Sequence, residues 1–244
     1  MTNLCVIIPT FNEADNLPKI TAALFDLQLP GLEILIVDDN SPDGTGQIAD
    51  QLAQKYPGVF HVLHRAGKMG LGTAYRQGFA WAIEHGAGYI VQMDADFSHS
   101  PHYLHQFLAQ MSNYDVVVGS RYVKGGKVEE KWSGWRWFLS WWANSVWVRL
   151  ILGVKTKDTT AGFKCWSREA LRQIELSRVN ANGYVFQVEM CYLAEKLGLR
   201  ILETPIYFED RRIGRSKMSV PVKLEAAWRV FEMRWRYRNV KRET

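Results

Sequence analysis

The chain has 244 residues, of which 47% are hydrophobic and 23% charged, a composition that allows one α/β domain with a sizeable core and excludes intrinsic disorder. Its net charge of +5 is unevenly placed, because the segment from Arg211 to the C-terminus carries +8 and residues 1–210 carry −3. A basic tail suits partners rich in negative charge, namely nucleic acid, anionic lipid or phosphorylated substrates, and equally a solvated helix.

The cysteines and the N-terminus indicate a compartment. Cys5, Cys165 and Cys191 form an odd, widely spaced set without a CxxC pair. This pattern favours reduced thiols over a disulfide framework or a zinc site. Met1 leads almost directly into an apolar run, without the basic region and cleavage site of a signal peptide. We therefore expect a cytoplasmic location.

Apolar runs alternate with helical patterns through the first half of the chain. Runs typical of buried strands occupy residues 4–9, 32–38, 59–64, 89–93 and 115–119. Helical patterns occupy residues 14–27, 43–56, 71–85 and 101–111. This order predicts an α/β fold with a mainly parallel sheet, helices on both faces and ligands at the carboxyl ends of the strands. From about residue 120 the pattern loosens into short elements.

The first two predicted strands end in acidic segments. Residues 9–13, PTFNE, place Glu13 at the ligand edge, although a helix cap with an acidic first turn has the same pattern. Residues 37–45, VDDNSPDGT, place carboxylates where they can bind a base or ribose hydroxyls; a turn and helix cap is the alternative. No GxGxxG follows the first strand, so a dinucleotide-binding domain of that type is not expected.

The strand at 89–93 ends in Asp94-Ala95-Asp96. Residues i and i+2 of an extended chain point the same way, so both carboxylates face one spot. Hard oxygen ligands suit Mg²⁺ or Mn²⁺, which can also neutralise the charge on a departing nucleoside diphosphate. Two solvated loop acids are the alternative.

Two other patterns carry less weight. Residues 67–74, GKMGLGTA, indicate either a close backbone approach to a ligand or a tight turn into a close-packed helix, and they lack the spacing of a P-loop. His99, His102 and His105 repeat every three residues, but we expect His102 and His105 on the exposed side of a helix rather than in a metal site.

Six tryptophans lie between residues 132 and 147, interleaved with basic side chains. Tryptophan prefers the membrane–water interface, so a helix over about 132–152 is predicted to lie in that plane; packing across the sheet is the alternative. The uncharged stretch 137–148 is too short to span a bilayer.

The C-terminal segment is predicted to form a basic amphipathic helix. Its apolar stripe comprises Leu224, Ala227, Trp228, Phe231 and Trp235. Anionic lipid, the sheet and a membrane-anchoring partner subunit are the surfaces that this helix would contact.

Seven motifs, in this order, resemble the family 2 glycosyltransferases with the GT-A fold, and among them the polyprenol-phosphate (dolichol-phosphate) mannose synthases. They are PTFNEADNLP (9–18), VDDNSPDGT (37–45), GLGTAYRQG (70–78), MDADFSHSP (93–101), GSRY (119–122), GYVFQVEM (183–190) and DRRIGRSK (210–217). The resemblance implies a GT-A domain over residues 1–218, followed by the basic helix at 219–244. It also implies inverting transfer of mannose from GDP-mannose to a polyprenyl or dolichyl phosphate, by a peripheral enzyme on the cytoplasmic face of a membrane.

The resemblance further implies a set of site residues. Asp94 and Asp96 would hold the divalent metal, and with Arg121 they would form the catalytic set. Phe11 stands where relatives often carry Tyr, and Ser98 where some offer a third metal ligand, Gln. The implied nucleotide-sugar contacts are Pro9, Phe11, Glu13, Val37, Asp39, Asp94, Ala95, Asp96, Arg121, Arg211 and Lys217.

Residue chemistry agrees with parts of this set. Arg211 and Lys217, on a loop with Gly214, can close cationic donors over a diphosphate; an exposed basic loop is the alternative. Arg136 and Ser140 are four residues apart on one helix face and, with Arg121, can bind an acceptor phosphate.

A phosphate acceptor changes what the mechanism requires. A phosphate monoester has a second pKa of about 6 and is mostly ionised near pH 7. It can attack without a general base, which a sugar hydroxyl would need. Asp158, in the segment DTTAGF, is a reserve candidate for a base and equally a cap or turn residue.

Several alternatives remain. The first is the same chemistry with UDP-glucose or another donor. A processive synthase is not expected, because the chain has neither a QxxRW motif nor a predicted transmembrane helix. A nucleic-acid-binding module would leave the strand-end acids unexplained, so no nucleic-acid partner is expected. A catalytically dead scaffold is a further alternative, although every expected acidic position is filled.

Overall fold

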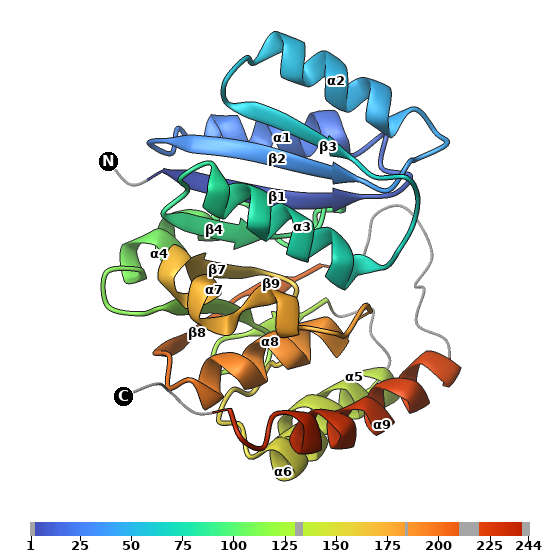
Figure 1. Cartoon of the computed structure of the whole chain (residues 1–244), viewed down its shortest axis with the longest axis vertical. Helices are drawn as coiled ribbons and strands as arrows, with labels where there is room; N and C mark the ends of the chain where they lie inside the picture. The colour runs from blue at the N-terminus through green and yellow to red at the C-terminus, as the bar shows by residue number, and fades with distance from the viewer. Residues whose placement is uncertain (1–2, 130–133, 184, 210–219, 241–244) are drawn as a thin grey trace.

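The computed structural model describes residues 3–129, 134–183, 185–209 and 220–240 (Figure 1). At its centre is a seven-stranded sheet in the order β3-β2-β1-β4-β7-β5-β8. Its strands are β1 (Leu4–Thr10), β2 (Leu32–Asp38), β3 (Phe60–His64), β4 (Tyr89–Gln92), β5 (Val116–Ser120), β7 (Lys164–Ser167) and β8 (Ile201–Pro205).

The strands are parallel except for β7, which runs antiparallel between β4 and β5. β1 shows why the strand sequences are continuously apolar. Leu4, Val6 and Ile8 face one core, whereas Cys5 and Ile7 face the other, so both sides of the strand are buried. The prediction of a mainly parallel sheet is confirmed.

Helices cover both faces of the sheet, as predicted (Figure 1). One face carries α3 (Leu71–Glu84), α7 (Arg168–Ile174) and α8 (Val185–Lys196). The other carries α1 (Leu17–Asp26), α2 (Thr45–Lys55) and α4 (Tyr103–Gln110). The short elements are β6 (Lys127–Val128), which pairs in parallel with β9 (Tyr207–Phe208), and η2 (Leu176–Arg178).

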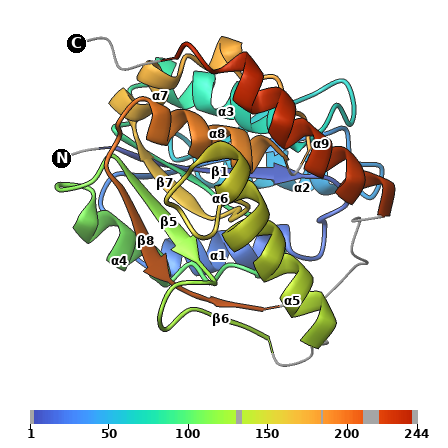
Figure 2. The ribbon, with the colours of Figure 1, turned by 90° about the horizontal axis from the view of Figure 1, so that it is seen from below.

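A pair of helical segments lies at one end of the molecule (Figures 1 and 2). α5 (Gly134–Trp142), the π-helix η1 (Ala143–Val148) and α6 (Arg149–Leu152) follow one another without a break. α9 (Val220–Arg236) lies beside α6 and α8. No helix in the described part of the chain is both long enough and apolar enough to cross a membrane.

The predicted strands agree with the observed ones to within one or two residues, but the first helix begins later than predicted. Residues 14–16 form a turn instead, because the Ala14 amide bonds the Asp43 carboxylate at 3.1 Å, and the helix begins at Leu17 with Pro18 in its first turn. The proposed division at residue 218 falls outside the described residues and stays a prediction.

Candidate active site

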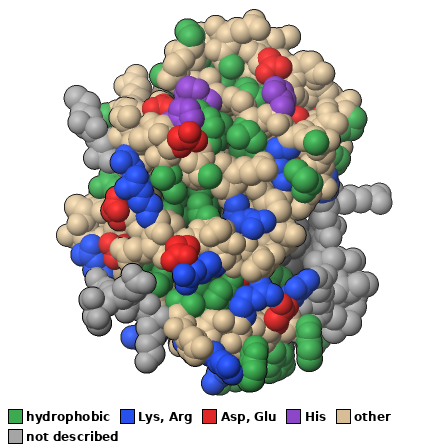
Figure 3. All heavy atoms as spheres, in the orientation of Figure 1, with side chains coloured by type: hydrophobic (Ala, Val, Ile, Leu, Met, Phe, Trp, Pro, Cys, Tyr) green, Lys and Arg blue, Asp and Glu red, His purple; other side chains and the backbone are tan. Residues whose placement is uncertain are grey.

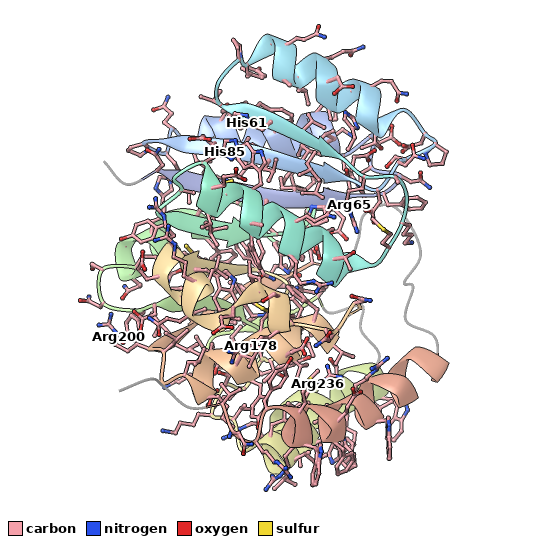
Figure 4. The ribbon with its side chains drawn as sticks, viewed as in Figure 1. His61, Arg65, His85, Arg178, Arg200 and Arg236 are labelled. Atoms are coloured by element: carbon pink, nitrogen blue, oxygen red, sulfur yellow. The ribbon has the colours of Figure 1, made fainter. Side chains whose placement is uncertain are left out.

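The predicted site residues that follow the parallel strands lie at the carboxyl edge of the sheet. Three sharp turns leave this edge, and each contains a residue in the left-handed region: Asn12 (φ 61°) after β1, Asn40 (φ 56°) after β2 and Phe97 (φ 62°) after β4. Such strained positions concentrate at functional sites. Figure 4 shows Arg65 at this edge, beside the ends of the strands.

The site has three groups of residues, here called corners, each of which follows one strand of the sheet. The first corner follows β2. Asp38 is a structural residue, since its carboxylate accepts hydrogen bonds from Thr10 Oγ1 at 3.0 Å and Ser41 Oγ at 2.6 Å. Asp39 instead pairs with the guanidinium of Arg65, and both side chains are buried. Burial raises the pKa of Asp39 above its usual range, although Arg65 opposes that rise.

The other predicted donor contacts of this corner lie around Asp39. Pro9 pairs with Val37 in the β1–β2 register, and Val37 is buried. The ring of Phe11 lies 4.5 Å from the ammonium of Lys68. The amide of Glu13 donates to a threonine hydroxyl of α2 at 2.9 Å.

The second corner follows β4. Asp96 is buried and accepts a hydrogen bond from the Ser98 amide at 3.1 Å, while Ala95 is buried between the two acids. Asp94 Oδ2 lies 4.0 Å from His99 Nδ1. Both carboxylates act on the phenol of Tyr75, whose pKa is raised first by burial and then by these two charges. The structure therefore brings Asp94 and Asp96 to one place.

The surroundings of these acids fit a divalent cation. Ser98 Oγ and His99 Nδ1 are buried beside them without a hydrogen-bond partner in the described structure, which leaves two polar atoms for a bound ion or its water ligands. Burial lowers the pKa of His99 to about 4, so its imidazole is neutral near pH 7. Within the described ranges no three His, Cys, Asp or Glu residues form a metal cluster of their own. His102 and His105 are exposed, as predicted.

The third corner follows β5. The Arg121 guanidinium donates to both oxygens of Asp158, from Nε at 2.8 Å and from Nη2 at 2.7 Å. Its Cζ lies 5.1 Å from the ring centre of Tyr122 and 5.3 Å from that of Phe208. Burial opposes the charge of Arg121, but the Asp158 carboxylate outweighs it and raises the pKa of the guanidinium.

A hydrogen bond joins α5 to this corner. The Tyr122 hydroxyl lies 2.7 Å from Ser140 Oγ. Arg136 lies one turn earlier on α5, but its side chain is outside the described residues, as are Arg211 and Lys217 altogether. Phe208 links the second and third corners, because its ring centre is also 5.5 Å from that of His99.

Three residues at the site were not predicted from the sequence: Arg65, Tyr122 and Thr160. Arg65 stands directly after β3, so the strand-end rule that selected the acids was sufficient to find it. Tyr122 belongs to the quoted GSRY motif, but a tyrosine next to an arginine carries no signal of its own. Thr160 was not selected from the sequence, and in the structure its hydroxyl accepts a hydrogen bond from Arg121 Nη2 at 2.8 Å.

The glycine-rich segment at the start of α3 packs against the chain itself. An added Cβ at Gly70 would lie 2.6 Å from the carbonyl oxygen of Asn182, and one at Gly72 would lie 2.3 Å from that of Ala181. The alternative of a close-packed helix start is therefore the one that the structure supports.

The mainly parallel sheet, with helices on both faces and paired carboxylates at its carboxyl edge, has the GT-A glycosyltransferase fold. The sequence profile of "Glycosyl transferase family 2" matches residues 5–174, and the chain belongs to this family. It is 45% identical to the polyprenol monophosphomannose synthase of Mycolicibacterium smegmatis, over 93% of this chain and 85% of that one. It is also 45% identical to the undecaprenyl-phosphate mannosyltransferase of Micrococcus luteus, over 94% and 92%.

Solved structures share the fold at lower sequence identity. A mannosyl-3-phosphoglycerate synthase from Rubrobacter xylanophilus has a TM-score of 0.68 at 18% identity, over 97% of this chain and 74% of that one. The mannosyltransferase PcManGT from Pyrobaculum calidifontis, in complex with GDP-Man and Mn²⁺, has a TM-score of 0.58 at 17% identity, over 88% and 58%.

Proposed function

We propose that this protein transfers mannose from GDP-mannose to the phosphate of a polyprenyl phosphate, with inversion, at a membrane surface. The observation that carries the proposal is the alignment of three corners on one sheet edge: Asp39, the Asp94–Asp96 pair and Arg121, whose neighbour Tyr122 contacts Ser140 of α5. The first would bind the nucleoside, the second the metal ion with the diphosphate, and the third the phosphate of the acceptor. Two relatives at 45% identity are named for mannose transfer to polyprenyl phosphates, which supports this choice of substrates.

The donor would bind along the first two corners. Pro9, Phe11, Glu13, Val37 and Asp39 would hold the nucleoside. Ala95 and the cationic side chains of Arg211 and Lys217 would contact the rest of the donor. Asp94 and Asp96 would hold Mg²⁺ or Mn²⁺, which when bound neutralises the charge of the leaving diphosphate.

The acceptor phosphate would bind at the third corner, on Arg121, Arg136 and Ser140. A phosphate oxygen forms the new bond to the anomeric carbon as the bond from that carbon to the diphosphate breaks on the opposite side. The acceptor oxygen is already anionic, so no proton has to be removed. Replacing Arg136 by Ala is expected to raise the KM for the acceptor more than the KM for the donor; equal increases would remove Arg136 from the acceptor site.

An apolar face next to this corner supports a lipid acceptor. The same helix, α5, places Ser140 beside Tyr122 and leaves Phe138 and Trp142 exposed. Figure 3 shows apolar side chains at the lower end of the molecule, with basic ones beside them. The exposed large apolar residues of α5, α6 and α9, here called the aromatic face, are Trp135, Phe138, Leu139, Trp142, Leu150, Trp228, Phe231 and Trp235.

This face would lie on the cytoplasmic surface of a membrane, with the acceptor phosphate at the level of the lipid headgroups. α9 buries Val230 and Met233, as the chain directly after it buries Tyr237, and α9 leaves Trp228 and Trp235 exposed. One side of α9 would thus pack on the rest of the protein while the other side contacts lipid. A membrane-anchoring partner subunit is the alternative occupant, and binding to protein-free vesicles distinguishes the two.

The donor assignment is tested with a panel of nucleotide sugars. With one short-chain polyprenyl phosphate as acceptor, the kcat/KM for GDP-mannose is expected to exceed those for UDP-glucose and GDP-glucose by at least tenfold. A preference for UDP-glucose would keep the reaction class and overturn the mannose assignment.

A further inference from the structure

We propose that Asp158 is a positioning residue, not a general base: it holds the Arg121 guanidinium by one edge and directs the opposite nitrogen, Nη1, toward the acceptor phosphate. The inference rests on the proposed function, in which Arg121 binds that phosphate. It assigns a role to a buried carboxylate that the transfer reaction itself does not require.

The contacts between the two residues are unusually complete. Three donors of Arg121 reach Asp158: the backbone amide at 2.9 Å, Nε at 2.8 Å and Nη2 at 2.7 Å. The Asp158 side chain is 0% exposed and that of Arg121 is 11% exposed. Charge-assisted, two-point pairing of this kind fixes the orientation of the guanidinium as well as its position.

Some N–H donors of the Arg121 guanidinium are not used by the described part of the protein and can bind a ligand. A guanidinium has five N–H donors, one on Nε and two on each terminal nitrogen. Nε and one hydrogen of Nη2 bind Asp158, and Nη2 also donates to Thr160 Oγ1 at 2.8 Å. Among the described residues no partner contacts Nη1. Its two donors are therefore available to a phosphate oxygen.

Asp158 is itself fixed by a second carboxylate. Glu203 on β8 accepts hydrogen bonds from the Asp158 amide at 2.9 Å and the Lys157 amide at 2.8 Å. It also accepts one from the hydroxyl of Ser120, the residue before Arg121, at 2.8 Å. The Glu203 side chain thus links the backbone at Asp158 to the end of β5, directly before Arg121.

The same contacts argue against a role in proton abstraction. A general base needs an oxygen within reach of the proton it removes. Both oxygens of Asp158 are engaged by Arg121, and the carboxylate is sealed from solvent. Deleting the carboxylate is therefore expected to act through Arg121.

The test compares Asp158→Asn with wild type, using a short-chain polyprenyl phosphate in detergent and GDP-mannose. Asparagine keeps the shape and loses the charge. We expect the KM for the acceptor to rise at least tenfold, the KM for the donor to change less than threefold, and the pH profile of kcat to keep its form. A general base would instead show a kcat lower by about 10²–10⁴ and an unchanged acceptor KM, and that result overturns the proposal.

A matched control has the same pairing geometry elsewhere. Arg200 binds both oxygens of Asp115 through Nε at 3.1 Å and Nη2 at 2.9 Å, on the opposite edge of the sheet. Asp115→Asn is expected to leave both KM values unchanged. An acceptor KM that rises equally in this variant would show that the effect of Asp158→Asn is structural and would overturn the proposal.

Two further measurements keep the test decisive. Arg121→Lys combined with Asp158→Asn should raise the acceptor KM no more than Arg121→Lys alone, because the carboxylate acts only through Arg121; additive increases contradict this.

If Asp158→Asn does not fold, Thr160→Ala should still raise the acceptor KM several-fold, and an unchanged value refutes the proposal. A wild-type protein inactive with every polyprenyl phosphate would refute the proposed function itself, whereas an active one with a normal acceptor KM in these variants refutes only this inference.

Discussion

Replacing Trp228 and Trp235 by Ala is expected to weaken membrane binding with little change in folding stability. Each of these residues is 71% exposed. A tryptophan that buries about 250 Å² would therefore bring roughly 175 Å² to a membrane, worth about 4 kcal/mol at ~25 cal/mol per Å² if wholly inserted. Half insertion gives about 2 kcal/mol for each residue, so the double variant should bind vesicles about 10²–10³ times more weakly.

Co-sedimentation with large unilamellar vesicles measures this change directly. Anionic phosphatidylglycerol vesicles should bind the wild type more tightly than zwitterionic ones, because Arg229, Arg234 and Arg238 flank the tryptophans. Val59→Ser, at an exposed apolar residue before β3, is the control and should bind like the wild type. Equal vesicle affinity in the double variant and the wild type would refute the placement of the aromatic face on lipid.

Three further predictions follow from the site and its supports. Asp96→Ala should lower transfer at least about 10³-fold and abolish Mn²⁺ binding by calorimetry while the chain stays folded, since hard oxygen ligands hold the ion; full activity would exclude the metal site. Arg65→Met should lower the free energy of unfolding in urea by about 3–5 kcal/mol, because it leaves the buried Asp39 carboxylate unpaired; no loss would mean that Asp39 is hydrated. Tyr237→Phe removes a 2.6 Å hydrogen bond to the buried Glu189 and should cost about 1.5–3 kcal/mol, which hydrogen exchange would report as faster exchange of α9.

The fold was predictable wherever one strand is buried on both faces. Each apolar run from residue 4 to residue 119 became a strand, and the carboxylates that follow those runs lie at one edge. The rule works because parallel strands end on the same side of the sheet, so sequence position alone places Asp39, Asp94 and Asp96 together. The antiparallel β7 was not predicted. Its sequence has only four residues, KCWS, and does not indicate the direction in which the strand runs in the sheet.

The partners of the site residues were harder to predict than the residues themselves. Asp158 lies 37 residues from Arg121, and its sequence context is equally that of a turn or a base. Only the fold brings β5 and the loop before β7 together and turns a candidate base into a salt-bridged anion. Glu203 is more distant still, since its hydrogen bond to Ser120 spans 83 residues and leaves no local pattern.

The measurement that tests the central claim most directly is the transfer of radiolabelled mannose from GDP-mannose to a short-chain polyprenyl phosphate, with Mg²⁺ or Mn²⁺ and with EDTA. We predict a labelled lipid product that forms with the metal ion and is lost in EDTA. Labelled lipid that forms equally in EDTA would contradict the role given to Asp94 and Asp96. The absence of product with every donor and metal, from a folded protein bound to vesicles, would contradict the proposed function.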